Sequence, residues 1–548
     1  MSRFVDTMVA TAASAGGRVR GMTTGEPNSP THRTWAQVHE HARRAAGALV
    51  ADGVAPGAAV AVLAGDPAAI APAVQAVWLA GGSTTMLHQP TPRTDLGEWA
   101  ADTVRVLRMI GAELVLLGAP FDALAPVLDE RGIRYRLLEA LDGEPLAEPV
   151  EVPESSPALL QLTSGSTADP KAVRITHGNL WSNAQGMRVA AQLDPENDRM
   201  VSWLPLFHDM GMVGFLTVPM LLGIDLVKVT PADFLGRPTL WPDLISRYRG
   251  TITAAPNFAY AIVARRMAGV EADDAFDLSS LRIALNGAEP IDPAAVHAFV
   301  SAGERFGLRP ECVLCAYGMA ETTLGVAFAP VFTGMAVDSV DQEELAAGRR
   351  AVPSDAPDAR VFPLLGPPLP GLEVQVVDES GAVRGEREVG QLRVRGEAVT
   401  PGYLTVDGPL ATQDAEGWLD TGDEGYVVDG QVVVCGRRKD VIIMGGRNIY
   451  PTDIERAATS VEGVRAGNAV AVRLDAGTRR ERFAVVVESR LADQEDAVRD
   501  LQKQISVKVV DAVGLRPFSI VVLPPGSLPK TPSGKLRRSA ATTLVPAS

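Results

Sequence analysis

The sequence predicts an α/β protein: a large N-terminal domain of parallel-sheet α/β subdomains with a small β unit, followed by a small α+β C-terminal domain. Strand-like apolar runs alternate with helical patterns along much of the chain, which is typical of parallel sheets. The 548 residues exceed one typical domain and leave room for about three to four core-sized units. A hydrophobic content of 46% and a charged content of 21% indicate a globular protein with an ample core.

Within the first 330 residues, apolar positions at helical spacing predict a helix over 35–51, which Asp52-Gly53 closes. A helix of small residues is expected over about 69–80. The strand-like runs that these helices separate are 59–63, 113–117, 158–162, 225–229, 251–254, 282–285 and 312–316. Sheets of this class present ligands at the carboxyl ends of their strands, where 285–290 and 316–318 fall.

The later part of the chain changes character at 338–358, which we interpret as an insertion on the surface. A short helix is expected over 341–348, and 349–357 is polar and rich in proline. A small β unit follows over about 363–437, and the composition changes again after 437. Helices at 453–460 and about 495–513, with strands at 469–474, 483–488 and 518–523, then predict the α+β domain. The expected domains are therefore 1–437 and 438–548.

Charge and composition exclude several classes of protein. A net charge of −15 argues against a dedicated nucleic-acid binder, which would show a basic stripe. No apolar run approaches the roughly 20 residues that span a bilayer, and no signal-peptide core is present. Three cysteines are too few for a disulfide framework and favour a cytoplasmic location. Cys312 and Cys315 are three apart on a predicted strand and so point to opposite faces, which favours a structural role.

The most informative stretch begins where the strand at 158–162 ends. Small residues follow: Thr163, Ser164, Gly165, Ser166 and Thr167. Such a loop can aim backbone N–H groups and hydroxyls at phosphate oxygens, and Lys171 adds a positive charge. Its spacing is not that of the common P-loop, because Pro170 stands where a glycine would precede the lysine. Alone, a cluster of this composition is more often an ordinary surface turn.

Four further patterns stand in order along the chain: 203–211 (WLPLFHDMG), 317–321 (YGMAE), 421–423 with 436–440 (TGD and GRRKD), and 529–535 (PKTPSGK). Together with the loop, they resemble the superfamily of acyl-adenylate-forming enzymes, which includes acyl-CoA synthetases, nonribosomal-peptide adenylation domains and luciferases. The resemblance covers nearly the whole chain. Within that superfamily, the chain is most similar to the fatty-acyl-AMP ligase branch, on the basis of 203–211, 285–290, Ala320 and 446–451. In that branch an insertion, here 338–358, is held to restrain a mobile C-terminal domain and to disfavour coenzyme A.

The resemblance implies a two-step reaction: a carboxylate attacks the α-phosphate of ATP, and a thiol then attacks the acyl-AMP. It implies ATP and Mg²⁺, with coenzyme A or a carrier-protein phosphopantetheine as acceptor. Lys535 would be the catalytic lysine, Glu321 would hold Mg²⁺ with help from Thr167, and His208 would border the acyl pocket. Lys439 would be the hinge and Gly446 would lie at the thiol channel. The nucleotide would be bound by the loop from Thr163 to Thr167 with Lys171, and by Gly287, Ala288, Glu289, Tyr317, Gly318, Met319, Asp423 and Arg437.

Two departures from the family pattern leave alternatives open. Ala168 and Ala172 replace glycines, and Asp169 puts a carboxylate beside the triphosphate, where like charge is unfavourable. From the resemblance as a whole, we still expect an acyl-activating enzyme that transfers its acyl group to a carrier protein or coenzyme A. The first alternative is a protein that forms thioesters from acyl-AMP supplied by a partner adenylating enzyme. The second is a non-catalytic acyl-nucleotide-binding protein, against which Lys535, Glu321 and Asp423 argue.

Overall fold

The computed structural model describes residues 2–90, 95–163, 169–444, 447–476, 478, 481–530 and 536–546. The chain divides into two compact units. The first unit comprises 1–335, 365–373 and 394–419, and the second comprises 336–364, 374–393 and 420–548. The predicted α/β class with a C-terminal α+β portion is confirmed by the sheets and helices of these units.

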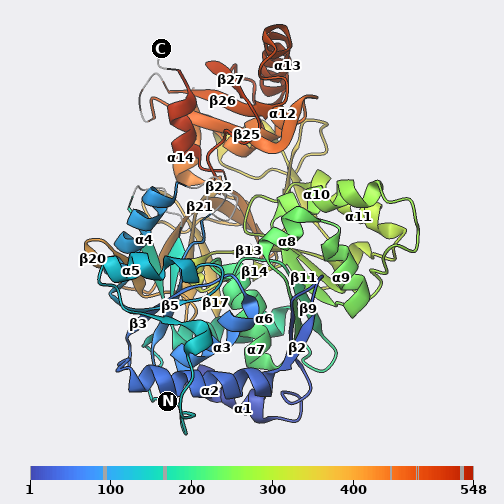
Figure 1. Ribbon diagram of the computed structural model, residues 1–548. Coiled ribbons are helices and arrows are strands. Elements are labelled where there is room, and N and C mark those ends of the chain that lie inside the picture. The colour runs from blue at the N-terminus through green and yellow to red at the C-terminus, as the bar shows by residue number, and fades with distance from the viewer. Residues whose placement is uncertain are drawn as a thin grey trace. The chain divides into compact units, whose positions relative to one another are not determined.

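One eight-stranded sheet of the first unit carries the segments after 285 and 316 (Figure 1). Its interior strands are parallel, and each edge ends in an antiparallel pair. Parallel neighbours need crossover connections, which the intervening helices supply. In spatial order the strands are β14 (Gly325–Phe328), β13 (Val313–Gly318), β12 (Ile283–Asn286), β11 (Ile252–Ala255), β9 (Arg199–Ser202), β10 (Asp225–Lys228), β1 (Gly21–Thr24) and β2 (Thr31–Thr34).

A second eight-stranded sheet of the same unit carries the small-residue loop. Parallel pairing on one side changes to antiparallel pairing at β7–β8 and β8–β19. In spatial order its strands are β20 (Gly408–Ala411), β19 (Gly402–Thr405), β8 (Lys171–Thr176), β7 (Pro157–Thr163), β4 (Ser83–Met86), β3 (Ala59–Leu63), β5 (Ala112–Leu117) and β6 (Tyr135–Leu137).

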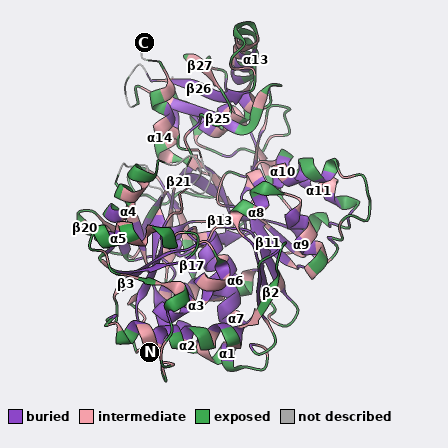
Figure 2. Cartoon of the chain, in the orientation of Figure 1, coloured by how far each residue is buried: buried purple, intermediate pink, exposed green. Residues whose placement is uncertain are grey.

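The helices of the first unit cover these largely buried strands (Figure 2). The expected helix over 35–51 is confirmed as α2, because Thr34 and Gln37 form a reciprocal capping box at its start. The unit contains α1 (Arg3–Ala13), α2 (Trp35–Ala51), α3 (Pro67–Leu79), α4 (Leu96–Ile110), α5 (Ala125–Glu130), α6 (His177–Ala190), α7 (Val218–Leu222), α8 (Pro231–Gly236), α9 (Leu240–Tyr248), α10 (Asn257–Ala268) and α11 (Pro293–Glu304).

The second unit begins with β ribbons and a four-stranded sheet, most of which belongs to this unit. The ribbons are β15 (Val337–Val340) with β16 (Arg360–Pro363), and β23 (Ile442–Met444) with β24 (Arg447–Ile449). In spatial order the sheet contains β17 (Leu372–Val377), β18 (Gly390–Gly396), β21 (Leu419–Val428) and β22 (Gln431–Arg437).

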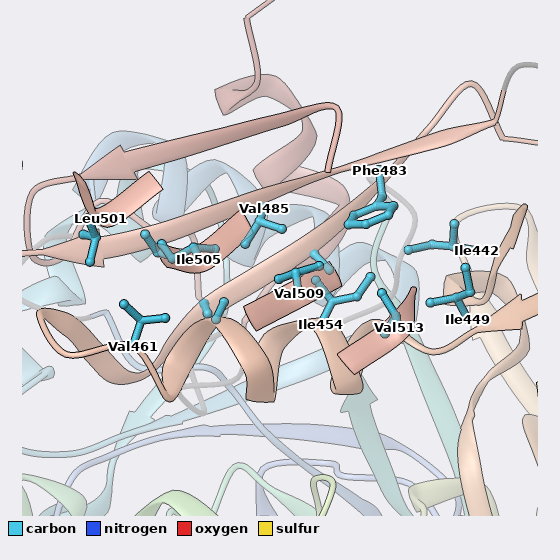
Figure 3. Close-up of a cluster of buried hydrophobic side chains, with 14 residues drawn as sticks. Ile442, Ile449, Ile454, Val461, Phe483, Val485, Leu501, Ile505, Val509 and Val513 are labelled. Carbon is cyan, nitrogen blue, oxygen red and sulfur yellow. The ribbon is translucent and has the colours of Figure 1, made fainter. Parts of the chain in front are cut away.

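A three-stranded sheet with helices on both faces forms the C-terminal part of the second unit. Its strands are β25 (Val464–Leu474), β26 (Arg482–Ser489) and β27 (Ser519–Leu523), and its helices are α12 (Pro451–Thr459), α13 (Glu495–Val513) and α14 (Arg538–Ala541). Residues that alternate along a strand face opposite sides. Phe483 and Val485 therefore join Ile454 of α12 and Ile505 of α13 in one core, shown in Figure 3. Val486 packs with Ala541 of α14 on the other face.

The segment 338–358 is largely exposed, but it contributes a few buried apolar residues to the second unit. Val340, Leu345 and Ala351 are 0%, 1% and 0% exposed, and they share a core with Tyr426 and Tyr450. The expected short helix is a π-helical turn over Glu344–Gly348. The apolar residues of 338–358 are too widely spaced in the sequence to give a periodic signal. Pairing of β15 with β16 brings them together in the structure. These buried residues anchor an otherwise largely exposed segment to the core of the second unit.

No helix within the described ranges is both long enough and apolar enough to cross a membrane.

Candidate active site

The small-residue loop leaves β7 and returns on β8. Thr163 at the end of β7 lies opposite Lys171 at the start of β8. The intervening Ser164, Gly165, Ser166, Thr167 and Ala168 lie outside the described residues. The Thr163 hydroxyl oxygen is buried, and none of the described residues forms a hydrogen bond with it. A buried hydroxyl without a partner is costly, so this atom is suited to meet a polar group of a ligand.

Glu321 and Lys171 are brought together by Tyr403 on β19. The Tyr403 hydroxyl donates a hydrogen bond to Glu321 Oε1 over 2.6 Å. The Lys171 ammonium lies 4.0 Å from the centroid of the same phenol ring. The backbone N–H of Thr400 also donates to the carbonyl oxygen of Glu321, over 2.8 Å. Two positions that the sequence assigned to one site are therefore neighbours, although 150 residues separate them along the chain.

Asp169 has a positively charged neighbour at the end of the loop. Its Oδ1 lies 3.7 Å from Arg105 Nη1, and Arg105 belongs to α4. Both side chains are about half exposed or more, so the pair is weak by itself. Ala172 is fully buried in β8, where its Cβ is part of the core. Two of the three unusual loop residues are thus accommodated by their surroundings.

The edge of the first sheet holds two of the predicted nucleotide-binding segments. β12 and β13 are parallel neighbours, with Asn286 opposite Cys315, so both segments leave at the same edge. A Cβ at Gly287 would stand 3.0 Å from the Ala316 carbonyl oxygen, so that position has room only for glycine without a shift. Ala288 adopts a left-handed φ of +68°, which is uncommon for a residue other than glycine.

The polar groups at this edge are held by local contacts. Glu289 accepts a hydrogen bond from the backbone N–H of Phe258 over 2.7 Å. Tyr317 and Met319 follow the edge of β13, with the Tyr317 hydroxyl 3.9 Å from the Met319 sulfur. A Cβ at Gly318 would stand 2.2 Å from the Leu324 carbonyl oxygen. Within the described part of the chain, the buried Asn286 Oδ1 has no hydrogen-bond partner, so this edge also offers an acceptor to a ligand.

His208 lies beside an acidic and a second basic side chain. Its Nδ1 is 2.7 Å from Asp209 Oδ1. The neighbouring Phe207 ring meets the His88 ring edge to face, with centroids 5.5 Å apart. Burial, with a smaller effect from the His208 charge, lowers the pKa of His88 to about 4. His88 is therefore neutral at physiological pH.

Asp423 and Arg437 are paired within the second unit. They lie opposite each other on β21 and β22, and Arg437 Nε is 2.9 Å from Asp423 Oδ1. Arg437 also donates to the Thr421 carbonyl oxygen over 3.1 Å. The two side chains that the sequence assigned to the ribose are therefore fixed to each other. They belong to a different unit from Glu321 and Lys171.

The expected hinge lies in a short 3-10 turn over Arg438–Asp440. The Lys439 carbonyl oxygen accepts from Arg473 over 3.4 Å. Next to it, Asp440 pairs with Arg538 over 3.3 Å. Arg538 also forms a two-armed contact with Glu455 over 2.9 and 2.7 Å. Lys535 and Gly446 lie outside the described residues.

Sequence reasoning missed Tyr403, Arg105 and His88. Tyr403 contacts Lys171 because β19 pairs with β8, two strands that are far apart in the sequence. Local sequence patterns do not predict such long-range pairing. The Cys312 and Cys315 thiols, singled out by their spacing, are buried, which raises the pKa of each to about 12. Both are therefore protonated near neutral pH.

The fold and these segments together define an adenylate-forming enzyme architecture. A family model described as AMP-binding enzyme matches residues 13–404, and a model described as AMP-binding enzyme C-terminal domain matches residues 446–540. The chain belongs to the AMP-binding enzyme family.

Three comparisons illustrate this relationship. The chain is 55% identical over 547 residues to Rv1013 of Mycobacterium tuberculosis, a ligase by provisional name only, with 100% of each chain covered. It is 35% identical to the medium-chain-fatty-acid–[acyl-carrier-protein] ligase JamA of Moorena producens, over 70% of this chain and 67% of that protein. A solved structure from work on fatty acyl-adenylate ligases of E. coli and L. pneumophila has a TM-score of 0.88 and 30% identity, and covers 99% of this chain and 97% of that chain.

Proposed function

We propose that this protein activates a carboxylic acid with a hydrophobic chain as acyl-AMP and transfers the acyl group to a phosphopantetheine thiol. In the first step a carboxylate oxygen bonds to the α-phosphorus of ATP, and the bond to the β-phosphate breaks to release pyrophosphate. In the second, the thiolate sulfur bonds to the acyl carbon and AMP leaves. The first step joins two anions, so the site must supply positive charge and orientation.

The observation that carries this proposal is the connected set of Lys171, Tyr403 and Glu321 beside the stem of the loop. Lys171 supplies a cation for phosphate oxygens, and the unpartnered Thr163 hydroxyl supplies a polar contact. Glu321, with Thr167, would hold Mg²⁺, which prefers carboxylate and phosphate oxygens and would add positive charge to the triphosphate. None of the described residues donates to Glu321 Oε2, so that oxygen suits a cation.

The remaining roles follow the same assignment. Asn286 to Glu289, with Tyr317, Gly318 and Met319, would frame the adenine, while Asp423 and Arg437 would bind the ribose. His208 would border the acyl pocket and stays next to a neutral His88. Lys535 would stabilise the first transition state, Lys439 would act as the hinge, and Gly446 would face the thiol. We also propose that the N-terminal domain, 1–437, and the mobile C-terminal domain, 438–548, meet at 437/438.

Contacts of the insertion support the fatty-acyl-AMP ligase branch. Gln342 donates to the Ala512 carbonyl oxygen over 2.5 Å, which connects the insertion to α13 within the second unit. Arg360, just beyond the insertion, pairs with Asp453 of α12 over 3.1 Å, and both side chains are mostly buried. We propose a carrier-protein thiol as the preferred acceptor, as the name of the M. producens relative states for that protein.

The alternative of a thioester-only protein rests on Ala168, Asp169 and Ala172. The contact of Asp169 with Arg105 and the burial of Ala172 in β8 favour full activity over this alternative.

The test is release of pyrophosphate from ATP with a series of straight-chain acids, with Glu321→Gln as the control. We expect pyrophosphate release that requires the straight-chain acid and that is slower in Glu321→Gln than in the wild type. Thioester formation from supplied acyl-AMP without any release would favour the half-reaction alternative. Nucleotide binding with neither reaction would favour a non-catalytic binding protein.

A further inference from the structure

Tyr403 occupies a position set by the register of β8 and β19. The strands are antiparallel, with Thr405 opposite Lys171 and Tyr403 opposite Val173. Residues opposite each other, and residues two apart on one strand, share a face of the sheet. Lys171 and Tyr403 are therefore diagonal neighbours on one face, within reach of a long and an aromatic side chain.

The phenol ring restrains the Lys171 ammonium. At 4.0 Å from the ring centroid, the cation lies well inside the distance at which the ring quadrupole attracts it. Lysine loses considerable rotamer freedom when it is held in one place. A ring that already holds the ammonium reduces the entropy that nucleotide binding must remove.

The phenol hydroxyl fixes the Glu321 carboxylate. At 2.6 Å the hydrogen bond to Oε1 is in the range of charge-assisted O–H to carboxylate bonds. The backbone of Glu321 is held independently by the Thr400 N–H. With Oε1 engaged by Tyr403, Oε2 is the oxygen left for a ligand.

We propose that Tyr403 is the positioning residue of the nucleotide site: its hydroxyl orients Glu321 toward Mg²⁺, and its ring holds Lys171 for the phosphates. The proposal rests on the proposed function and deepens it. It assigns two separable tasks to one side chain. The hydroxyl acts on metal affinity, and the ring acts on the affinity for metal-free nucleotide.

Two substitutions separate these tasks. Tyr403→Phe removes the hydroxyl and keeps the ring, while Tyr403→Leu removes both. We expect Tyr403→Phe to raise the Mn²⁺ concentration that half-saturates the ATP-bound protein about tenfold, as measured by electron paramagnetic resonance, with no change in binding of a fluorescent ATP analogue without metal. We expect Tyr403→Leu to weaken that metal-free binding about fivefold as well.

Tyr248→Phe is the matched control. The Tyr248 hydroxyl also donates to a glutamate, Glu26, over 2.6 Å, but outside the candidate site. This variant should leave both affinities unchanged, and all three should keep the wild-type thermal transition to within a few degrees. Wild-type Mn²⁺ affinity in Tyr403→Phe, or equal nucleotide affinity in Tyr403→Phe and Tyr403→Leu, would overturn the proposal.

Binding is measured without acid turnover, so the two claims can fail separately. If the wild-type protein binds Mn²⁺ and ATP but forms no acyl-AMP, the proposed function fails while the variants still decide the role of Tyr403. If the wild-type protein binds neither, both the proposed function and the positioning role are overturned.

Discussion

Lys228 is a cation in a buried environment. It is 1% exposed, and its ammonium donates to the carbonyl oxygens of Leu204 and Val229. Desolvation lowers the pKa of Lys228 to about 7, and the nearby charge of Asp233, which raises the pKa, is the smaller effect. Leu204 belongs to the segment that leads to His208, so this lysine fastens that segment to the end of β10.

The depressed pKa of Lys228 predicts a dependence of stability on pH. The unfolded lysine still binds its proton between about pH 7 and its usual pKa, whereas the folded one has lost it. The unfolded state therefore carries the extra proton there, and folding becomes more favourable as pH rises through this window. Relative to Lys228→Met, the wild-type unfolding free energy should rise by up to about 1.4 kcal/mol per pH unit.

Urea unfolding at pH 7 and pH 9.5 measures this difference. Lys503→Met is the control, because Lys503 is exposed on α13 and its loss should not change the slope with pH. Parallel pH dependences for the wild type and Lys228→Met would contradict a buried, titrating Lys228.

Arg105 predicts how the protein tolerates Asp169. Arg105→Glu replaces an attractive partner with a like charge beside the loop, so the KM for ATP should rise about threefold at low salt and less at high salt. Arg108→Glu makes the same change in net charge on the exposed side of α4 and should have little effect. The exchange Arg105→Asp with Asp169→Arg should restore most of the affinity. Equal effects of the two single variants would show that only net charge matters.

At the scale of elements, local signals predicted most helices and strands. The helix α2 and the strand β3 have the bounds expected from caps and apolar runs. The strand at 312–316 is β13, which begins one residue later and extends to Gly318. The burial of Val340, Leu345 and Ala351 and the approach of Tyr403 to Lys171 could not be predicted, because both depend on pairing between distant strands. The sequence was enough to identify candidate site residues, but the side chains that contact them could be identified only from the structure.

The link between the insertion and α13 predicts acceptor choice. Gln342→Ala removes the hydrogen bond to the Ala512 carbonyl oxygen, so the insertion should hold the C-terminal helices less tightly. We expect the ratio of coenzyme A thioester to carrier thioester to rise about fivefold, the usual effect of one hydrogen bond. Gln502→Ala is the control, since its amide also donates to a backbone carbonyl, that of Ile520 over 2.7 Å, but within the C-terminal part. An unchanged ratio in Gln342→Ala would remove the insertion from acceptor choice.

The turn over Arg438–Asp440 predicts a hinge that separates the two half-reactions. Proline at 439 fixes φ near −65° and should restrict backbone rotation there. Acyl-AMP formation should persist in Lys439→Pro, while thioester formation from supplied acyl-AMP should fall at least tenfold. Lys439→Ala keeps the backbone free and should retain both activities. Equal loss of both half-reactions in the proline variant would place the hinge elsewhere.

At the scale of the whole molecule, the proposed machinery is divided between two units. Lys171, Tyr403 and Glu321 belong to the first unit, and Asp423, Arg437 and Lys439 belong to the second. Each set is ordered by contacts within its own unit, so each can be tested by binding or by one half-reaction. The central claim is that both sets serve one reaction that passes through an acyl-AMP.

Transfer of oxygen from the acid to AMP tests that claim most directly. The acid is supplied with both carboxylate oxygens as ¹⁸O, together with ATP and a phosphopantetheine thiol, and the AMP is analysed by mass spectrometry. If the carboxylate attacks the α-phosphorus, one labelled oxygen stays on the phosphate when the thiol displaces AMP. We predict AMP carrying one ¹⁸O atom, formed in a 1:1 ratio with thioester. Thioester formation with unlabelled AMP would contradict an acyl-AMP intermediate.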